Sequence, residues 1–212
     1  MIKIVIFDFD GTIADTEQWT LDIYNELATK YGYKTYTIRE MEEMKKMHLS
    51  KLLTVLDIPY SKVFILLKEG QSILKKNINN VRAFTEDLKK ILMQIRELTG
   101  TIGIISSNTK KNIRRFCKNK DIEMDFIISS PLFTKEIKIN RIINKYRVKP
   151  EEILYVGDEV RDIESSQKAG VKIASATWGY NDKELLSESN PDYLIDSISE
   201  LIEILHKENR KN

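Results

Sequence analysis

Two acidic side chains follow the first apolar segment of the chain, at a place where they could act together. Residues 1–9 (MIKIVIFDF) predict a buried strand, and Asp8 and Asp10 stand at its end. Residues two apart on an extended chain point to the same side, so both carboxylates can enter one crevice. Gly11 then permits a sharp turn away. The simpler alternative is that Asp10 and Gly11 only form that turn.

A segment rich in hydroxyl groups follows the second apolar run. Thr101–Ser106 (TIGIIS) predicts a strand, and Ser107, Asn108 and Thr109 come directly after it. These residue types are preferred at helix N-caps, so one explanation is that they cap a helix predicted over Lys110–Asn119. The N-terminus of a helix also binds anions, so capping and phosphate binding are compatible.

A lysine after the third apolar run could supply positive charge. Lys135 is expected in a loop before a helix that begins near Ile137, and Lys138 competes for the same role. For either lysine, a solvent-exposed surface position is the alternative. An ammonium group close to the hydroxyl segment would suit phosphoryl oxygens.

Further carboxylates follow the fourth apolar run, Ile153–Gly157, and these are Asp158, Glu159 and Asp162. The dipole of a following helix also favours acidic residues in its first turn. A set of carboxylates suits Mg²⁺, a hard ion that prefers oxygen ligands. The chain has 2 His and 1 Cys, so it cannot assemble a zinc site of the usual His/Cys type.

The elements that position these side chains alternate between strand and helix. The predicted strands are residues 1–9, 101–106, 126–128, 153–157, 171–175 and 193–195, and helices are predicted at 86–98, 110–119, 137–146, 160–169 and 198–205. Strands that are apolar almost throughout and alternate with helices predict an α/β fold, with a Rossmann-like parallel sheet covered by helices on both faces. Ligands of such sheets bind outside the carboxyl ends of the strands, where the polar residues lie. The tail, residues 206–212, is expected to be frayed.

One interval interrupts the alternation. Residues 16–80 offer only helical patterns, at 19–31, 38–47, 49–56 and 60–77, which is too much helix for an ordinary crossover. We therefore predict a small all-helical cap over residues 16–80, inserted after the first strand into a core formed by residues 1–15 and 81–212. A single decorated crossover is the alternative, and it differs mainly in whether the insert moves.

The polar segments resemble the motifs of a known superfamily. Residues 8–15 (DFDGTIAD) look like the first motif of haloacid-dehalogenase-superfamily hydrolases. Ser107-Asn108 resembles their second motif, Lys135 the third and residues 157–162 (GDEVRD) the fourth. The helical insert resembles the cap of the phosphoglycolate-phosphatase-like branch. Two features depart from that branch, because Glu136 rather than Pro follows Lys135 and residues 81–84 lack a Pro-Gly pair.

The resemblance implies a role for each matching residue. Asp8 would be the nucleophile and Asp10 the general acid and base. Mg²⁺ would be bound by Asp8, Asp10 through its carbonyl, and Asp158, with Asp162 and Glu159 in the surrounding shell. The phosphate-binding residues would be Ser107, Asn108, Lys135, Gly11 and Thr12.

The resemblance also implies an activity. A carboxylate two residues after the nucleophile is typical of phosphatases and phosphomutases rather than of dehalogenases. We expect a phosphatase that hydrolyses a small phosphomonoester, phosphoglycolate-like or a sugar phosphate, through an aspartyl-phosphate on Asp8. A phosphomutase of the beta-phosphoglucomutase type shares every motif and is the alternative. A response-regulator receiver is disfavoured because its acceptor aspartate follows a later strand and it has no cap.

Composition excludes several other classes of protein. The chain has 212 residues, with 34 basic and 32 acidic side chains that are interspersed, so we expect no binding to nucleic acid. No apolar run is long enough to span a bilayer, and no signal-peptide pattern is expected. The single Cys117 excludes a disulfide scaffold and indicates a reducing compartment. We therefore expect a cytoplasmic enzyme acting on a small phosphorylated metabolite, as a monomer or a dimer.

Overall fold

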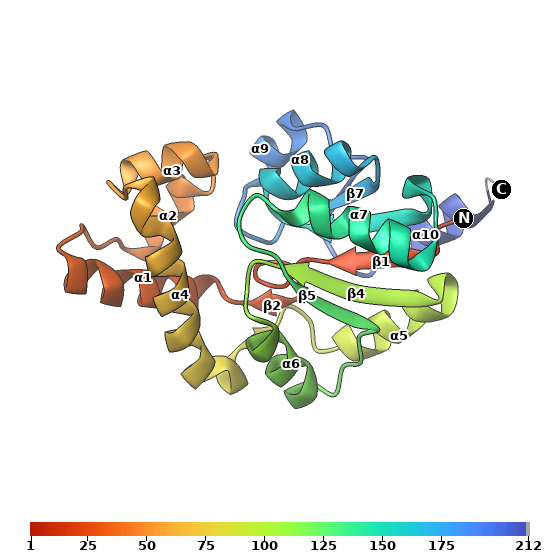
Figure 1. Cartoon of the computed structure of the whole chain (residues 1–212), viewed down its shortest axis with the longest axis horizontal. Coiled ribbons are helices and arrows are strands. Elements are labelled where there is room, and N and C mark those ends of the chain that lie inside the picture. Colours follow the sequence, from red (N-terminus) through yellow and green to blue (C-terminus); the bar gives the residue numbers. More distant parts are fainter. Residues whose placement is uncertain (211–212) are drawn as a thin grey trace.

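A six-stranded parallel sheet forms the centre of the molecule. The computed structural model describes residues 1–210. The strands are β1 (Ile4–Phe7), β4 (Thr101–Ser106), β5 (Phe126–Ser129), β6 (Ile153–Gly157), β7 (Lys172–Ala176) and β8 (Tyr193–Ile195). They are ordered β5-β4-β1-β6-β7-β8, and every neighbouring pair is parallel (Figure 1). The first strand therefore lies in the interior of the sheet, between β4 and β6.

Helices cover both faces of this sheet. On β1, Val5 and Phe7 belong to one apolar cluster, whereas Ile4 and Ile6 belong to the other. The first cluster includes side chains of α5 (Leu88–Thr99), α6 (Lys110–Asn119) and α10 (Glu200–Arg210), and the second includes side chains of α7 (Lys135–Tyr146), α8 (Val160–Ala169) and α9 (Lys183–Glu188). Both faces are buried, which explains why the strands are apolar throughout. The predicted α/β fold class is confirmed.

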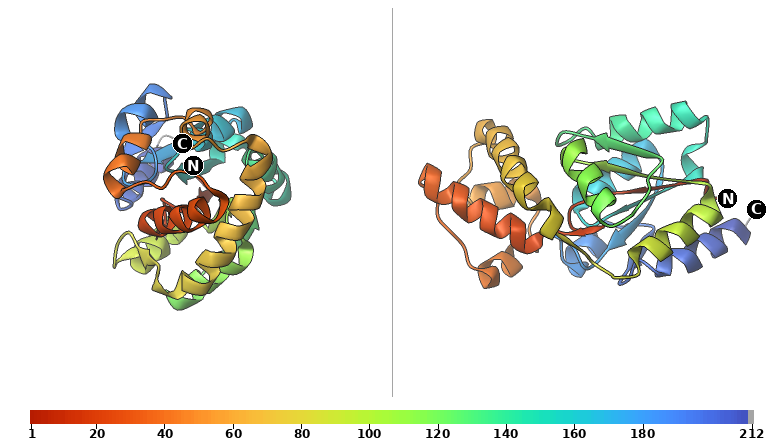
Figure 2. Two further views of the ribbon diagram at one scale, coloured as in Figure 1. Left: turned by 90° about the vertical axis from the view of Figure 1, so that its left-hand side faces the viewer. Right: turned by 90° about the horizontal axis from the view of Figure 1, so that it is seen from below.

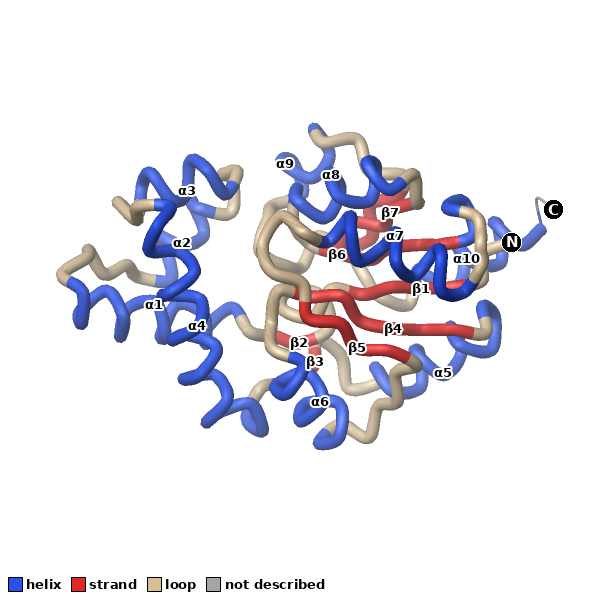
Figure 3. The backbone as a smooth tube through the Cα atoms, viewed as in Figure 1, coloured by secondary structure: helices blue, strands red, loops and turns tan. Residues whose placement is uncertain are grey.

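Four helices form a separate group at the carboxyl end of the sheet (Figures 1 and 2). They are α1 (Glu17–Tyr31), α2 (Ile38–Met44), α3 (Leu49–Val55) and α4 (Tyr60–Asn77), and we call them the helical unit. The chain enters through β2 (Ala14–Asp15) and returns through β3 (Arg82–Ala83), which pair antiparallel beside the main sheet (Figure 3). Short 3-10 helices occupy Ile78–Asn80 and Pro150–Glu152. The helical unit thus lies over the edge of the sheet where the polar motifs end.

Several local expectations were wrong. Lys135 is the first residue of α7 and not part of a loop, because the helix begins two residues earlier than its apolar pattern. The tail is not frayed at residues 206–210, since α10 continues to Arg210 with Leu205 and Glu208 buried. Residues 211–212 lie outside the described part of the chain. Within residues 1–210, no helix is both long enough and apolar enough to cross a membrane.

Candidate active site

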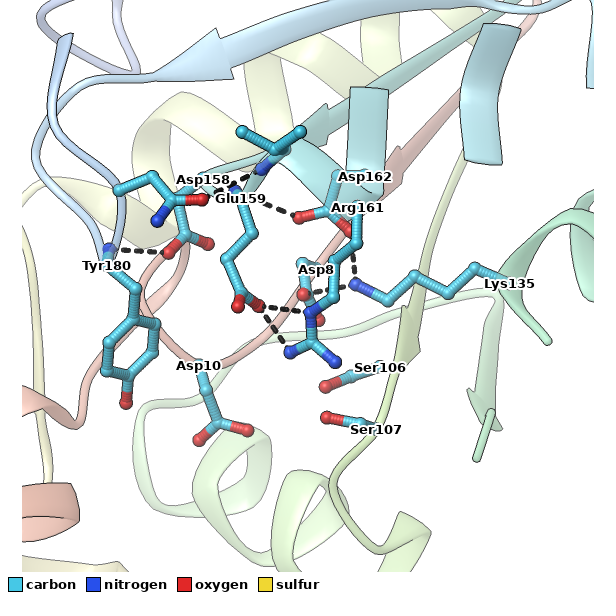
Figure 4. A network of polar contacts seen from close by, with 12 residues as sticks. Asp8, Asp10, Ser106, Ser107, Lys135, Asp158, Glu159, Arg161, Asp162 and Tyr180 are labelled. Atoms are coloured by element: carbon cyan, nitrogen blue, oxygen red, sulfur yellow. Dashed lines mark hydrogen bonds and ion pairs between the residues drawn. The ribbon is translucent and has the colours of Figure 1, made fainter. Parts of the chain in front are cut away.

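The register of the sheet brings three polar segments to one place. Phe7 pairs with Ile104 on β4 and with Val156 on β6. The residues that follow these strands therefore meet at one edge, where the Asp8 amide donates to the Val156 carbonyl at 2.8 Å. The carboxylates that follow β1 and β6, the serines at the end of β4 and Lys135 of α7 all gather there (Figure 4). This is the convergence that the strand ends predicted.

Asp8 is a buried carboxylate whose charge is compensated by a lysine. Its side chain is 3% exposed, and the Phe9 amide donates to its Oδ1 at 2.7 Å. The ammonium of Lys135 donates to Asp8 and to Asp162, and it is buried with them. Burial alone would lower the pKa of Lys135, but the charges of Asp162 and Asp8 outweigh burial and hold this pKa well above its ordinary value. Lys135 therefore remains a cation inside the site.

Lys138 does not pair with the carboxylates as Lys135 does, within the part of the chain that the structure describes. It is half-buried on α7, one helical turn after Lys135, and it forms no ion pair within residues 1–210. Of the two lysines that the sequence left open, the structure brings Lys135 to the carboxylates.

Asp10 is held by an amide from the second motif. The Asn108 Nδ2 donates to both carboxylate oxygens of Asp10, at 3.1 and 3.0 Å. Burial, followed by the nearby charge of Asp8, raises the pKa of Asp10 to about 7. Hydrogen bonds from Asn108 and the Thr16 hydroxyl act in the opposite direction, because they stabilise the charged form. A carboxyl with this pKa can both give and take a proton near neutral pH.

Asp158 lies at the end of β6 in a tightly packed place. It accepts a hydrogen bond from the Thr12 hydroxyl at 2.5 Å and another from the Tyr180 amide at 2.8 Å. A Cβ atom added to Gly11 would lie 2.1 Å from Asp158 Oδ2, and one added to Gly179 would lie 2.3 Å from the Asp158 side chain. Burial and the charges of neighbouring carboxylates, Glu159 first, raise the pKa of Asp158 well above its ordinary value.

Glu159 and Asp162 complete the acidic group. Ligand oxygens of Asp8, Glu159 and Asp162 all lie within 4.8 Å of one another. Glu159 pairs with Arg161, whose Nε donates to Glu159 Oε2 at 2.7 Å. Asp162 Oδ2 accepts from the Glu159 amide at 3.2 Å.

The balance of charge in the group fits a divalent cation. Five carboxylates gather there with two cationic side chains, which leaves an excess of negative charge when all are ionised. The carboxylates are those of Asp8, Asp10, Asp158, Glu159 and Asp162, and the cations are Lys135 and Arg161 (Figure 4). Burial first, and the uncompensated charge of the neighbouring carboxylates second, raise the pKa values of Asp10 and Asp158. The candidate ligands are all oxygens, the donor set that Mg²⁺ prefers.

The serines of the second motif line the opposite wall. The hydroxyls of Ser106 and Ser107 point toward the space bounded by Asp10 and Arg161 (Figure 4). Ser106 is fully buried, and its hydroxyl accepts from the Asn108 amide at 3.2 Å, whereas Ser107 is half-buried. Ser107 is therefore the more accessible hydroxyl for a ligand.

Sequence reasoning did not single out three residues of this site. Arg161 neutralises Glu159, while Tyr180 and Asn181 contact Asp158 through their backbone amides. The rule that points to polar residues after each parallel strand, applied to the fifth predicted strand as well, would have found Tyr180 and Asn181. The hydroxyl of Thr12, a residue expected to bind phosphate, donates to Asp158.

Known proteins share this sequence pattern and fold. Residues 5–176 match the family described as haloacid dehalogenase-like hydrolase. A phosphoglycolate phosphatase of Synechococcus elongatus is 26% identical over 205 residues, which cover 95% of this chain and 96% of that protein. The pyrophosphatase PpaX of Bacillus thuringiensis is 25% identical over 215 residues, 99% of each protein. The crystal structure of a predicted phosphatase from Clostridium acetobutylicum has a TM-score of 0.83 at 16% identity and covers 98% of this chain and 99% of its own, which shows a common fold.

Proposed function

The chain belongs to the haloacid dehalogenase-like hydrolase family, and we propose that it is a Mg²⁺-dependent phosphatase that hydrolyses a small phosphomonoester through an aspartyl-phosphate on Asp8. The observation that carries this proposal is the pairing of a buried carboxylate, Asp8, with the buried ammonium of Lys135 at the end of the central strand. Asp10, two residues further on, supplies a carboxyl with a pKa near neutrality.

The proposed reaction has two displacements at phosphorus. In the first, an Asp8 oxygen attacks the phosphorus, the ester P–O bond breaks, and the leaving oxygen takes a proton from Asp10. In the second, Asp10 removes a proton from a water molecule whose oxygen attacks the phosphorus, and the bond to Asp8 breaks to release inorganic phosphate. A carboxylate is already ionised at neutral pH, so the nucleophile needs no activating base. The main barrier is repulsion between carboxylate and phosphate, so catalysis depends on positioning and charge neutralisation.

Several side chains would supply that neutralisation. The Lys135 ammonium and the Ser107 hydroxyl would hold phosphoryl oxygens. Asp8, the Asp10 carbonyl and Asp158 would bind Mg²⁺, with Asp162 and Glu159 around them. When bound, the ion would neutralise negative charge on the phosphoryl group and on Asp8.

The helical unit would act as a cap. In this proposal residues 16–80 cover a core made of residues 1–15 and 81–212. A cover over the carboxyl ends of the strands limits the size of the substrate and excludes water during the first displacement. A small substrate agrees with the names of the two relatives, a phosphoglycolate phosphatase and a pyrophosphatase.

Phosphate release tests this proposal. The panel contains phosphoglycolate, pyrophosphate and several sugar phosphates, each assayed with Mg²⁺ and with a chelator. Asp8→Asn should abolish phosphate release, while a cooperative thermal unfolding transition shows that the variant is folded. Asp22→Asn is the matched control, because Asp22 is on α1 and contacts Gln18 at an exposed position. Release by Asp8→Asn would contradict the proposal, and conversion of a sugar phosphate to its isomer without free phosphate would favour the phosphomutase.

A further inference from the structure

The segment after β7, residues 178–182, lies between the helical unit and the carboxylates of the site. Its Tyr180 amide donates to Asp158 Oδ2 at 2.8 Å, and its Asn181 amide donates to the Asp158 carbonyl at 3.2 Å. We call residues 178–182 the post-β7 segment. Its backbone therefore contacts a proposed metal ligand at two points.

The side chain of Tyr180 reaches the helical unit. Its hydroxyl lies 2.9 Å from the hydroxyl of Thr16 and 2.7 Å from that of Thr20. Thr16 is buried at the entrance to α1, and Thr20 lies on the first turn of that helix at an exposed position. One tyrosine hydroxyl thus joins the core to the first helix of the helical unit.

Tyr180 joins both threonines through its hydroxyl, and in each contact either oxygen can be the donor. The Thr16 hydroxyl also stabilises the charged form of Asp10 and so lowers the pKa of that carboxyl against the effect of burial. Tyr180 therefore contacts one hydroxyl that acts on Asp10 and another that belongs to α1.

The side chain of Asn181 makes a second connection. Its Oδ1 accepts from the amide of Val160, the first residue of α8, at 2.9 Å. Its Nδ2 donates to the Lys45 carbonyl at 3.2 Å and to the Met47 carbonyl at 3.5 Å, both beyond the end of α2. The start of α8, which follows Asp158 and Glu159, is therefore tied to the segment that follows α2 in the helical unit.

We propose that Tyr180 and Asn181 are positioning residues that couple the placement of the helical unit to the site. Tyr180 orients Asp10 through Thr16, and Asn181 fixes Asp158 and the start of α8. When the unit moves away, both connections break together, so the acid and the metal ligands are fully ordered only under a closed cover. This coupling rests on the proposed function and extends it, because it names residues that make turnover depend on closure.

Substitutions of Tyr180 and Asn181 should affect different quantities, the first kcat and the second the affinity for Mg²⁺. Tyr180→Phe removes the hydroxyl but keeps the amide that binds Asp158, so kcat should fall about 10-fold while the dissociation constant for Mg²⁺ stays within about 2-fold of wild type. Asn181→Ala removes both side-chain connections, and the loss of such outer partners should weaken Mg²⁺ binding about 10-fold. Calorimetric titration with MgCl₂ measures the second effect without any substrate.

Variants on the other side of the contact exclude a general loss of structure. Thr20→Val should lower kcat as much as Tyr180→Phe does, whereas Thr20→Ser, which keeps the hydroxyl, should retain the wild-type kcat. The double variant Tyr180→Phe with Thr20→Val should lose no more kcat than either single variant. Tyr24→Phe and Asn119→Ala are the controls, because Tyr24 bonds within the helical unit and Asn119 bonds Asn79 away from the site. Both controls should retain wild-type kcat and Mg²⁺ affinity.

The outcomes separate this coupling from the proposed function. If the wild-type protein releases phosphate but Tyr180→Phe and Thr20→Val match it in kcat, the Tyr180 connection is refuted. If Asn181→Ala binds Mg²⁺ like wild type, the Asn181 connection is refuted. If the wild-type protein releases no phosphate from any substrate, the proposed function fails, and the Mg²⁺ titrations still decide whether Asn181 positions the acidic group.

Discussion

Lys135 is the residue on which the charge balance of the site depends most. It is buried with Asp8 and Asp162 and contacts both. Removing one partner of a buried ion pair leaves an uncompensated charge, which typically costs about 3 kcal/mol or more. Lys135→Met should therefore lower the free energy of unfolding by about 3 kcal/mol and kcat/KM by at least about 100-fold.

Lys138→Met is the matched control for that variant, since the lysine is on the same helix and forms no ion pair within residues 1–210. Its unfolding free energy should stay within about 0.5 kcal/mol of wild type. Urea unfolding and phosphate release measure both variants. Equal effects of the two substitutions would contradict the assignment of Lys135.

The buried carboxyls also predict how stability depends on pH when metal is removed. Burial raises the pKa of Asp10 from its ordinary 3.8 to about 7, and it raises that of Asp162 to about 6 despite the opposing charge of Lys135. A carboxyl whose pKa is higher in the folded chain destabilises the fold once ionised. This penalty is absent below the unfolded pKa, grows as pH rises, and is complete above the folded pKa.

In chelator, the thermal unfolding midpoint should therefore rise as pH falls from about 7.5 to about 5.5, by about 3 °C or more. Added Mg²⁺ favours the ionised carboxylates and should flatten this dependence. Asp10→Asn should reduce it without metal, because one of the titrating groups is gone. A midpoint that falls over this range in chelator would show that the carboxyls are not held as described.

At the scale of residues, the sequence predicted which side chains meet but not how each is oriented. Asp8, Asp10 and Asp158 follow apolar strands, so their shared location follows from the parallel sheet. The partner of Asp158 depends on contacts between distant segments, and the Thr12 hydroxyl and the Tyr180 amide come from opposite ends of the chain. No local pattern encodes such a contact.

At the scale of elements, hydrophobic periodicity located the long segments. The helices Lys110–Asn119 and Val160–Ala169 and the strand Ile153–Gly157 match their predicted bounds. The short elements β2, β3 and α9 were not predicted. Two-residue strands exist only through their pairing, and α9 (Lys183–Glu188) is too short for a periodic pattern to identify.

Gly11 lies at a tight turn that packs directly against Asp158. Its φ is +76°, and an added Cβ would lie 2.1 Å from Asp158 Oδ2. Gly11→Ala should therefore both strain the backbone and displace Asp158, with a loss of about 100-fold in kcat/KM, the scale expected for a misplacement near 1 Å. Phosphate release and thermal unfolding measure the two effects.

Gly32→Ala separates strain from displacement. Gly32 ends α1 with a φ of +77°, and its added Cβ would meet no atom within 4 Å. This variant should lose about 1 kcal/mol of stability and retain wild-type kcat/KM. If Gly11→Ala behaved in the same way, the close packing around Asp158 would have no catalytic consequence.

At the scale of the whole molecule, the helical unit contacts the core around the site at several points. Gln71 on α4 donates to the Ser107 carbonyl at 2.7 Å. Leu132, in the loop before Lys135, is 9% exposed and packs in one cluster with Leu53 and Val63 of the helical unit. The loop that precedes Lys135 is therefore also one of the surfaces against which the helical unit packs.

Leu132→Ala should weaken that docking because it removes most of the core's contribution to the cluster, at a cost of about 2 kcal/mol for a buried leucine. The helical unit would then spend more time away from the sheet, which predicts faster proteolysis at its connections, residues 14–16 and 81–84, and a several-fold higher KM for a small ester.

Leu67→Ala on α4 is the control, since Leu67 is 36% exposed. The core should keep its hydrogen-exchange protection in both variants, because α5 to α10 supply most of the side chains that cover the sheet and the helical unit adds mainly Leu74, with Trp19 and Ile23 packed against the cluster. Unchanged proteolysis in Leu132→Ala would mean that the hydrogen bonds from Gln71 and Asn181 are sufficient to keep the helical unit in place.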